Sequence, residues 1–346
     1  MNYTYLGRTG LKVSPLCLGT MNFGPETSEA DSYAIMDKAL ELGINFFDTA
    51  NVYGWKKGEG VTEQIVGRWW AQGNGRREKV VIATKVYGVM GDWPNESKLS
   101  ARHIKQACEA SLRRLQTDYI DLYQLHWPNR NSPHFGKHWP GKLRFSTVDA
   151  AAHTAQMQEI LETLADSVKR GTIRHFGLSD DTPWGIQQYL RLADQHQWPR
   201  IVSIQNEFSL LHSKDWPYLI EQCVHERVAF LPWSPLATGA LSGKYLGGAR
   251  PAGSRWSLSQ RLGLFRDNPQ SENAITRYAD IARKAGMTPA QLALAWCNQV
   301  DGVTSTIIGA TSLEQLAEDI DAFDLHLSKE TLSAVHTTLR QFPSPF

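Results

Sequence analysis

The chain has 346 residues, of which 42% are hydrophobic and 21% are charged, and its formal net charge at pH 7 is +1. This composition is typical of a globular protein, and a charge so close to zero argues against a nucleic acid or an anionic membrane as its partner. No apolar run approaches the roughly 20 residues that a transmembrane helix needs, so we expect no membrane-spanning segment.

The N-terminal part of the chain predicts a hairpin followed by a strand and a helix. Residues 3–14 alternate partly between apolar and polar side chains, as short hairpins do. Residues 15–24 then read as a first strand. Ser28 begins a helix with a capping-box-like pattern, and Gly43 ends it.

The same alternation of strand and helix continues along the chain. The predicted strands cover residues 15–24, 45–49, 80–86, 119–126, 173–179, 201–208, 228–233 and 304–309. Later helices are predicted at residues 62–71, 100–115, 157–170, around 186–193, 216–226, 272–285, 289–298 and 312–322, with an extra C-terminal helix at 327–339. Eight strands, each followed by helix, predict an α/β fold in which residues 1–346 form a single (β/α)8 TIM barrel domain.

Long irregular segments follow the fourth and the seventh predicted strands. Residues 128–152 are rich in Pro, Gly, His and aromatic side chains, and residues 235–272 are rich in Gly. Segments of this length inside a compact domain are usually functional or disordered. Because residues 128–152 directly follow the fourth strand, we expect them to form a wall or lid of a site.

The N-terminus and the cysteines indicate the compartment. Residues 1–10 have neither a basic start nor an apolar stretch, so we expect no signal peptide. Cys17, Cys108, Cys223 and Cys297 lie far apart and form no CxxC pair. We therefore expect four buried thiols in a reducing cytoplasm, and neither a disulfide nor a metal site.

Four polar residues lie at or just after the C-terminal ends of predicted strands. Asp48 and Tyr53 occur in FFDTANVYG, Lys85 ends VVIATKV, and His126 lies late in YIDLYQLHW. Parallel barrel strands present their C-terminal ends at one mouth, so the four side chains are expected to converge there.

These four residue types together suit the reduction of a carbonyl group. A carbonyl that accepts hydride develops negative charge on its oxygen and needs a proton donor beside it. Tyr53 could be this donor, because the ammonium of Lys85 would stabilise the phenolate that remains. Asp48 would hold that ammonium in place. His126 could then orient the carbonyl group by a hydrogen bond. Each residue alone also fits packing, a turn or a solvated charge, so it is their combination that favours catalysis.

At this point the sequence resembles the aldo-keto reductase superfamily. FDTANVYG, ATKV and LHWP are similar to that family's Asp/Tyr, Lys and His motifs, and the resemblance runs from TGLKVSPLCLGTMNFG to the final helices. It is closest to a bacterial, Tas-like branch and to potassium-channel β subunits. It implies a catalytic tetrad of Asp48, Tyr53, Lys85 and His126 on a barrel that binds NADPH/NADP+ without a Rossmann domain. No GxGxxG motif opens any βα unit, in agreement with this.

The resemblance also implies residues that bind cofactor and substrate. Trp233 would stack on the nicotinamide ring, and Arg255 could hold the 2′-phosphate. The implied cofactor-binding residues are Gly19, Thr20, Met21, Ser179, Asp180, Gln205, Trp233, Ser234, Leu236, Gly239, Lys244, Arg255, Gly309, Ala310, Thr311, Gln315, Glu318 and Asp319. The substrate pocket, which Met21 would also line, is expected to be walled by Phe23, Trp55 and Trp127.

Two positions depart from the family's pattern. Asp180 and Asp319 stand where the family commonly has Asn, and an ionised Asp accepts hydrogen bonds but does not donate them. The balance between NADPH and NADH therefore stays open. The first hypothesis is a cytoplasmic NADPH-dependent reductase whose small-molecule carbonyl substrate is an apolar or aromatic aldehyde or ketone. It has neither a nucleic acid nor a membrane as partner, and its oligomeric state is left open. The alternative is an NADPH-binding, redox-sensing regulatory subunit of a membrane partner.

Overall fold

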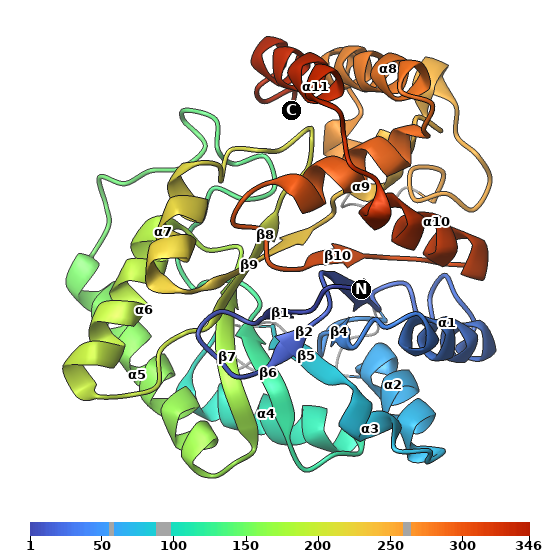
Figure 1. Ribbon diagram of the computed structural model, residues 1–346. Helices are drawn as coiled ribbons and strands as arrows, with labels where there is room; N and C mark the ends of the chain where they lie inside the picture. Colours follow the sequence, from blue (N-terminus) through green and yellow to red (C-terminus); the bar gives the residue numbers. More distant parts are fainter. Residues whose placement is uncertain (55–58, 88–97, 259–263) are drawn as a thin grey trace.

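The computed structural model describes residues 1–54, 59–87, 98–258 and 264–346. In this part of the chain an eight-stranded parallel sheet has the strand order β10-β3-β4-β5-β6-β7-β8-β9. Its strands are β3 (Leu16–Gly19), β4 (Phe46–Asp48), β5 (Val81–Val86), β6 (Ile120–Leu125), β7 (Ile173–Ser179), β8 (Ser203–Glu207), β9 (Ala229–Trp233) and β10 (Thr306–Ile308). The sheet closes where Val303 bridges to Phe230 and the N–H of Thr304 donates to the Phe230 carbonyl at 2.9 Å. The result is the predicted (β/α)8 barrel (Figure 1).

Helices surround the barrel on its outside (Figure 1). They are α1 (Glu29–Glu41), α2 (Val61–Ala71), α3 (Arg76–Lys79), α4 (Ala101–Leu115), α5 (Ala150–Lys169), α6 (Pro183–His196), α7 (Tyr218–Glu226), α8 (Pro269–Lys284), α9 (Pro289–Gln299), α10 (Leu313–Asp324) and α11 (Lys329–Gln341). Hydroxyl side chains at the residue before the helix accept backbone N–H groups and so fix several starts, as at Ser28, Ser100 and Ser312. No helix in the described ranges is long and apolar enough to cross a membrane.

The N-terminal hairpin covers the end of the barrel opposite the mouth. Strands β1 (Thr4–Tyr5) and β2 (Lys12–Val13) are antiparallel, as predicted. Leu6 is fully buried with the apolar side chains that fill the barrel interior. The turn requires glycine, because Gly7 has φ +56° and a Cβ there would lie 2.4 Å from the Val202 carbonyl oxygen.

The long segments after β6 and β9 are shorter, and contain more helix, than the sequence predicts. Helix α5 begins at Ala150, capped by Asp149, and not at residue 157. Its first two turns are largely exposed, so they lack the apolar spacing that the prediction relied on. The loop after β9 contains short 3₁₀ helices at Ala237–Ser242, Leu246–Gly248 and Leu264–Arg266, which the sequence did not indicate. α3 was not predicted either.

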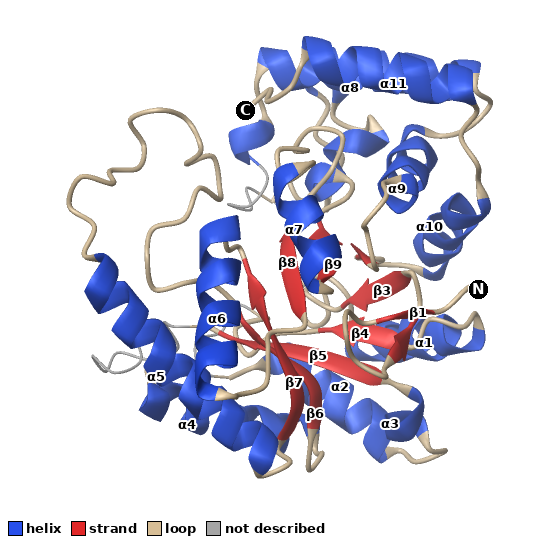
Figure 2. Ribbon diagram, turned by 60° about the vertical axis from the view of Figure 1, so that its left-hand side comes forward, coloured by secondary structure: helices blue, strands red, loops and turns tan. Residues whose placement is uncertain are grey.

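Helices α8 to α11 pack together beside the mouth, as seen clearly in Figure 2. The extra C-terminal helix, α11, lies along α8, and α10 lies along α9. This arrangement places the N-terminus of α10 and the loop after β9 on the same side of the mouth. The four cysteines are buried and free, as expected.

Candidate active site

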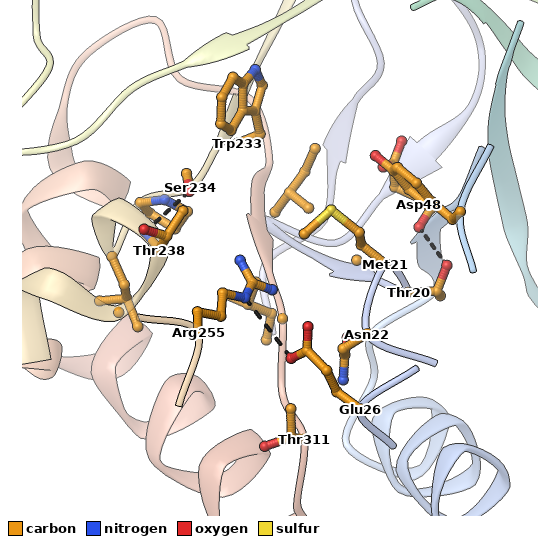
Figure 3. A pocket seen from close by; sticks show the side chains of 18 of the residues that line it. Thr20, Met21, Asn22, Glu26, Asp48, Trp233, Ser234, Thr238, Arg255 and Thr311 are labelled. Carbon is orange, nitrogen blue, oxygen red and sulfur yellow. Dashed lines mark hydrogen bonds and ion pairs between the residues drawn. The ribbon is translucent and has the colours of Figure 1, made fainter. Parts of the chain in front are cut away.

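A pocket with a volume of about 920 Å³ opens at the C-terminal ends of the barrel strands. Most residues named from the sequence line it. Figure 3 labels several of them, among them Asp48, Trp233 and Arg255. They are Gly19, Thr20, Met21, Asp48, Tyr53, His126, Trp127, Ser179, Asp180, Gln205, Trp233, Ser234, Leu236, Gly239, Lys244, Arg255, Gly309, Thr311, Gln315, Glu318 and Asp319. The structure thus brings together residues from the end of β3 to the first turns of α10.

Lys85 connects two of the residues at the mouth. Its ammonium forms an ion pair with Asp48 and donates to the Tyr53 hydroxyl at 3.1 Å and to the Thr49 carbonyl at 2.9 Å. The Lys85 side chain is fully buried behind Asp48 and Tyr53, and it does not itself line the pocket. All three donor directions of the ammonium are therefore used within the protein.

The second oxygen of Asp48 is held by two amides. The side chain of Gln205 donates to Asp48 Oδ1 at 2.9 Å and that of Gln124 donates at 3.1 Å. These glutamines come from β8 and β6, so the carboxylate is fixed from both sides of the barrel. Sequence reasoning assigned Gln205 to the cofactor and missed Gln124.

Burial and charge set the protonation states of the site. Burial alone would lower the pKa of Lys85, but the attraction of Asp48 and then of Tyr53 outweighs it and the pKa is raised. Burial raises the pKa of Tyr53, and the smaller effect of Lys85 lowers it. The phenol and the ammonium both keep their protons at neutral pH.

His126 is a neutral imidazole surrounded by rings. Burial, followed by repulsion from Lys85, holds its pKa well below the ordinary value. Its ring centroid lies 5.8 Å from those of Tyr53 and Tyr87 and 5.7 Å from that of Trp127. Because Nδ1 of His126 has no hydrogen-bond partner in the described part of the chain, packing positions this ring.

The end of the pocket away from Asp48 carries the cationic residues. Arg255 points toward Glu26 across the pocket, with 3.9 Å between Arg255 Nε and a Glu26 oxygen (Figure 3). At the start of α10, Gln315 accepts the backbone N–H of Thr311 at 3.0 Å. Burial, with a contribution from Glu318, raises the pKa of Asp319 to about 7. This end could therefore hold a phosphate-bearing group, since it combines cations with a helix N-terminus.

Two predicted residues, Phe23 and Ala310, do not line the pocket. Phe23 is fully buried in the hydrophobic core, because the chain turns after Thr20 and directs this ring inward. Ala310 is also buried in the core, and its carbonyl accepts from the Asn22 side chain at 2.7 Å. Both side chains therefore lie outside the lining of the pocket to which the sequence assigned them. Trp55 lies outside the described residues.

Several lining residues were missed by the sequence reasoning. They include Asn22, Glu26, Tyr87, Phe135, Thr238 and Phe265. Tyr87 lies two residues beyond Lys85 and could have been found from the alternation of the strand. Phe135 lies in the segment that was expected to form a wall, whereas no sequence signal distinguishes Glu26.

Comparison with known proteins identifies the family. The model of the Aldo/keto reductase family matches residues 15–339. The chain belongs to this family. It is 41% identical to Protein tas of Escherichia coli (strain K12) over 353 residues, which covers 100% of this chain and 99% of that protein. It is 38% identical to the Uncharacterized oxidoreductase YrpG of Bacillus subtilis (strain 168) over 349 residues, with 100% and 97% covered.

A fungal relative is similar over nearly the same length. The chain is 31% identical to the Versiconal hemiacetal acetate reductase of Aspergillus parasiticus over 362 residues, covering 96% of this chain and 95% of that protein. The resemblance to a Tas-like branch of an oxidoreductase family is thus confirmed. In the described part of the chain, no group of three or more His, Cys, Asp or Glu residues is arranged to hold a metal ion.

Proposed function

We propose that the chain catalyses the NADPH-dependent reduction of an aldehyde or ketone to an alcohol, as a cytoplasmic enzyme formed by one domain of residues 1–346. The observation that carries this proposal is the buried ammonium of Lys85, which lies between the Asp48 carboxylate and the Tyr53 hydroxyl. Relatives named as reductases, such as the Versiconal hemiacetal acetate reductase, support the same direction of chemistry.

Each residue of the tetrad would have a separate role in the reduction of the carbonyl group. The Tyr53 hydroxyl gives its proton to the carbonyl oxygen as negative charge develops there. Lys85 stabilises the phenolate that remains, and Asp48 keeps the ammonium charged and in place. The neutral imidazole of His126 donates a hydrogen bond to the same oxygen and orients it. When bound, a nicotinamide cofactor would supply the hydride that reduces the carbonyl carbon.

The pocket has the groups that such a cofactor needs. Trp233, Ser179 and Gln205 lie near the tetrad end and would hold the nicotinamide. Lys244 and Arg255 are the lining cations at the other end and would hold the phosphates, with Arg255 suited to the 2′-phosphate. Thr311, Gln315, Glu318 and Asp319 would contact the adenosine.

Tyr53→Phe tests the proposal. This variant keeps the ring and loses the acidic proton, so NADPH binding measured by protein fluorescence should stay within about twofold. The rate of NADPH oxidation with a panel of aldehydes and ketones should fall about a hundredfold or more. The control is Tyr3→Phe, which removes the hydroxyl of a tyrosine that is 47% exposed and bonded to the Gly43 carbonyl. Its rate should not change.

The outcomes separate the hypotheses. Unchanged turnover in Tyr53→Phe would remove Tyr53 from the mechanism. Tight NADPH binding without turnover across a broad panel would favour the regulatory-subunit alternative, which no feature of the described residues supports at present. Failure to bind NADPH or NADH would overturn the proposed cofactor site.

A further inference from the structure

The carboxyl group of Asp180 lies between two indole rings. Trp127 Nε1 donates to Asp180 Oδ2 at 2.7 Å, and Trp233 Nε1 donates to Asp180 Oδ1 at 3.1 Å. Trp127 follows β6, Asp180 follows β7 and Trp233 ends β9. One carboxyl group therefore connects three strand ends around the mouth.

The position of this carboxyl group is fixed by the backbone. Asp180 has φ +49°, a left-handed conformation that Asp and Asn tolerate better than most residues. Its N–H donates to the Gln205 carbonyl at 3.0 Å, which ties the residue to the end of β8. The side chain is 3% exposed, so it cannot rotate into solvent. The indoles are therefore held by an anchor that is itself immobile.

The two tryptophans form one wall of the pocket together with Phe135. The centroid of the Phe135 ring lies 5.2 Å from that of Trp127 and 5.9 Å from that of Trp233. All three rings line the pocket, and the Trp127 centroid is also 5.7 Å from that of His126. Trp127 is 37% exposed, so packing alone does not fix its ring. Its indole N–H needs an acceptor to hold it at one angle.

The geometry points to Asp180 as a positioning residue: it orients Trp127 at the substrate end and Trp233 at the nicotinamide end, and through Trp127 it sets the width of the substrate site. This inference rests on the proposed reductase function. It also differs from the direct cofactor contact that the family resemblance implied for Asp180, since both oxygens already accept an indole N–H. An Asn would not replace it, because both oxygens of Asp180 accept an indole N–H, whereas one side of an amide is a donor and would face an indole donor. Burial raises the pKa of the Asp180 carboxyl group well above its ordinary value, and the indole N–H groups of Trp233 and Trp127 act against this rise.

A double-mutant cycle tests this inference. It compares the wild type with Asp180→Asn, with Trp127→Phe/Trp233→Phe and with the variant that carries all three substitutions. In Asp180→Asn, one indole loses its acceptor, at a cost that corresponds to about a tenfold rise in KM for a flat aromatic aldehyde. The kcat for that aldehyde and the KM for a small aliphatic aldehyde should each change less than about threefold, and any loss of NADPH affinity should disappear in the background without the two indoles. In the background without the two indoles, Asp180→Asn should add little to the aromatic KM.

Fluorescence of the protein without cofactor gives a readout independent of turnover. Loss of the indole hydrogen bond should change the emission spectrum of Asp180→Asn, and the change should disappear in the variant that lacks both indoles. Asp319→Asn is the matched control, because it makes the same chemical change at the far end of the pocket and should leave the emission unchanged. Thermal denaturation confirms that each variant is folded.

The results that overturn the inference are specific. If Asp180→Asn weakens NADPH binding equally with and without the two indoles, Asp180 contacts the cofactor directly. If neither the emission nor the aromatic KM changes, the indoles do not depend on Asp180. Absence of turnover in the wild type would instead refute the proposed function. The fluorescence of the four variants would still show whether Asp180 holds the two indole rings.

Discussion

Asp48→Asn should destabilise the protein more than its small change in shape suggests. Asp48 is 3% exposed and pairs with Lys85, which is fully buried. Removing one partner of a buried ion pair costs about 3–5 kcal/mol, because the other charge is left without compensation. The new amide also has only one acceptor oxygen, although Lys85 donates to one oxygen of Asp48 and Gln124 and Gln205 donate to the other.

The expected loss can be converted to a shift in Tm. With about 2.1 cal/mol/K per residue, a chain of 346 residues has an unfolding entropy of about 0.7 kcal/mol/K. A loss of about 3–5 kcal/mol then lowers Tm by about 4–7 °C. Calorimetry of the protein without cofactor measures this shift directly, separate from any effect on activity.

Two variants make the test decisive. Glu41→Gln breaks the pair between Lys38 and Glu41, whose side chains are 40% and 68% exposed, and should lower Tm by less than about 1.5 °C. Asp48→Asn/Lys85→Met removes both charges of this pair and should recover at least half of the loss. The reasoning is refuted if Asp48→Asn shifts Tm no more than Glu41→Gln does, or if the second substitution adds a further loss.

Two further predictions concern pH and the cofactor. Burial lowers the pKa of His134 and His212 to about 3, whereas an unfolded His has a pKa of about 6.5, so only the unfolded chain takes up these protons as pH falls between those values. The contribution of these histidines to stability should be complete above pH 6.5 and fall by up to about 1.4 kcal/mol per pH unit for each histidine as the pH decreases. Urea denaturation of His212→Gln should therefore show a slope that is smaller than the wild-type slope by up to about 1.4 kcal/mol per pH unit. Arg255→Met should raise the dissociation constant of NADPH about tenfold or more and that of NADH much less, because only NADPH has a 2′-phosphate. Equal losses in a fluorescence titration would exclude Arg255 from that phosphate.

The sequence predicts the barrel and the convergence of the tetrad for a clear physical reason. Parallel strands alternate with helices, and their C-terminal ends must face one mouth, so Asp48, Lys85 and His126 come together whatever their distance in sequence. The bridging position of Lys85 does not follow from topology alone. It depends on the side-chain conformations of three residues packed against each other.

The differences between the predicted and the observed side-chain positions arise where periodicity ends. Phe23 and Ala310 lie just beyond the strands β3 and β10, where the chain turns and period two no longer gives the direction of a side chain. Phe135 and Glu26 lie in loops, whose residues carry no repeating pattern. The hydrogen bonds from Trp127 and Trp233 to Asp180 could not be predicted for a different reason. Both partners are more than 50 residues away from Asp180 in sequence.

The two ends of the barrel interior differ in the kind of side chain that they bury. The interior near the hairpin is filled with apolar side chains such as Leu6, Cys17 and Phe46, which stabilise the fold without polar groups. The mouth instead buries the ion pair of Lys85 and Asp48, which contributes little net stability. Apolar substitutions that remove a whole charge pair at the mouth should therefore be tolerated by the fold while abolishing activity. Substitutions that remove only one charge of a buried pair should lower stability more, because the other charge stays buried without a partner.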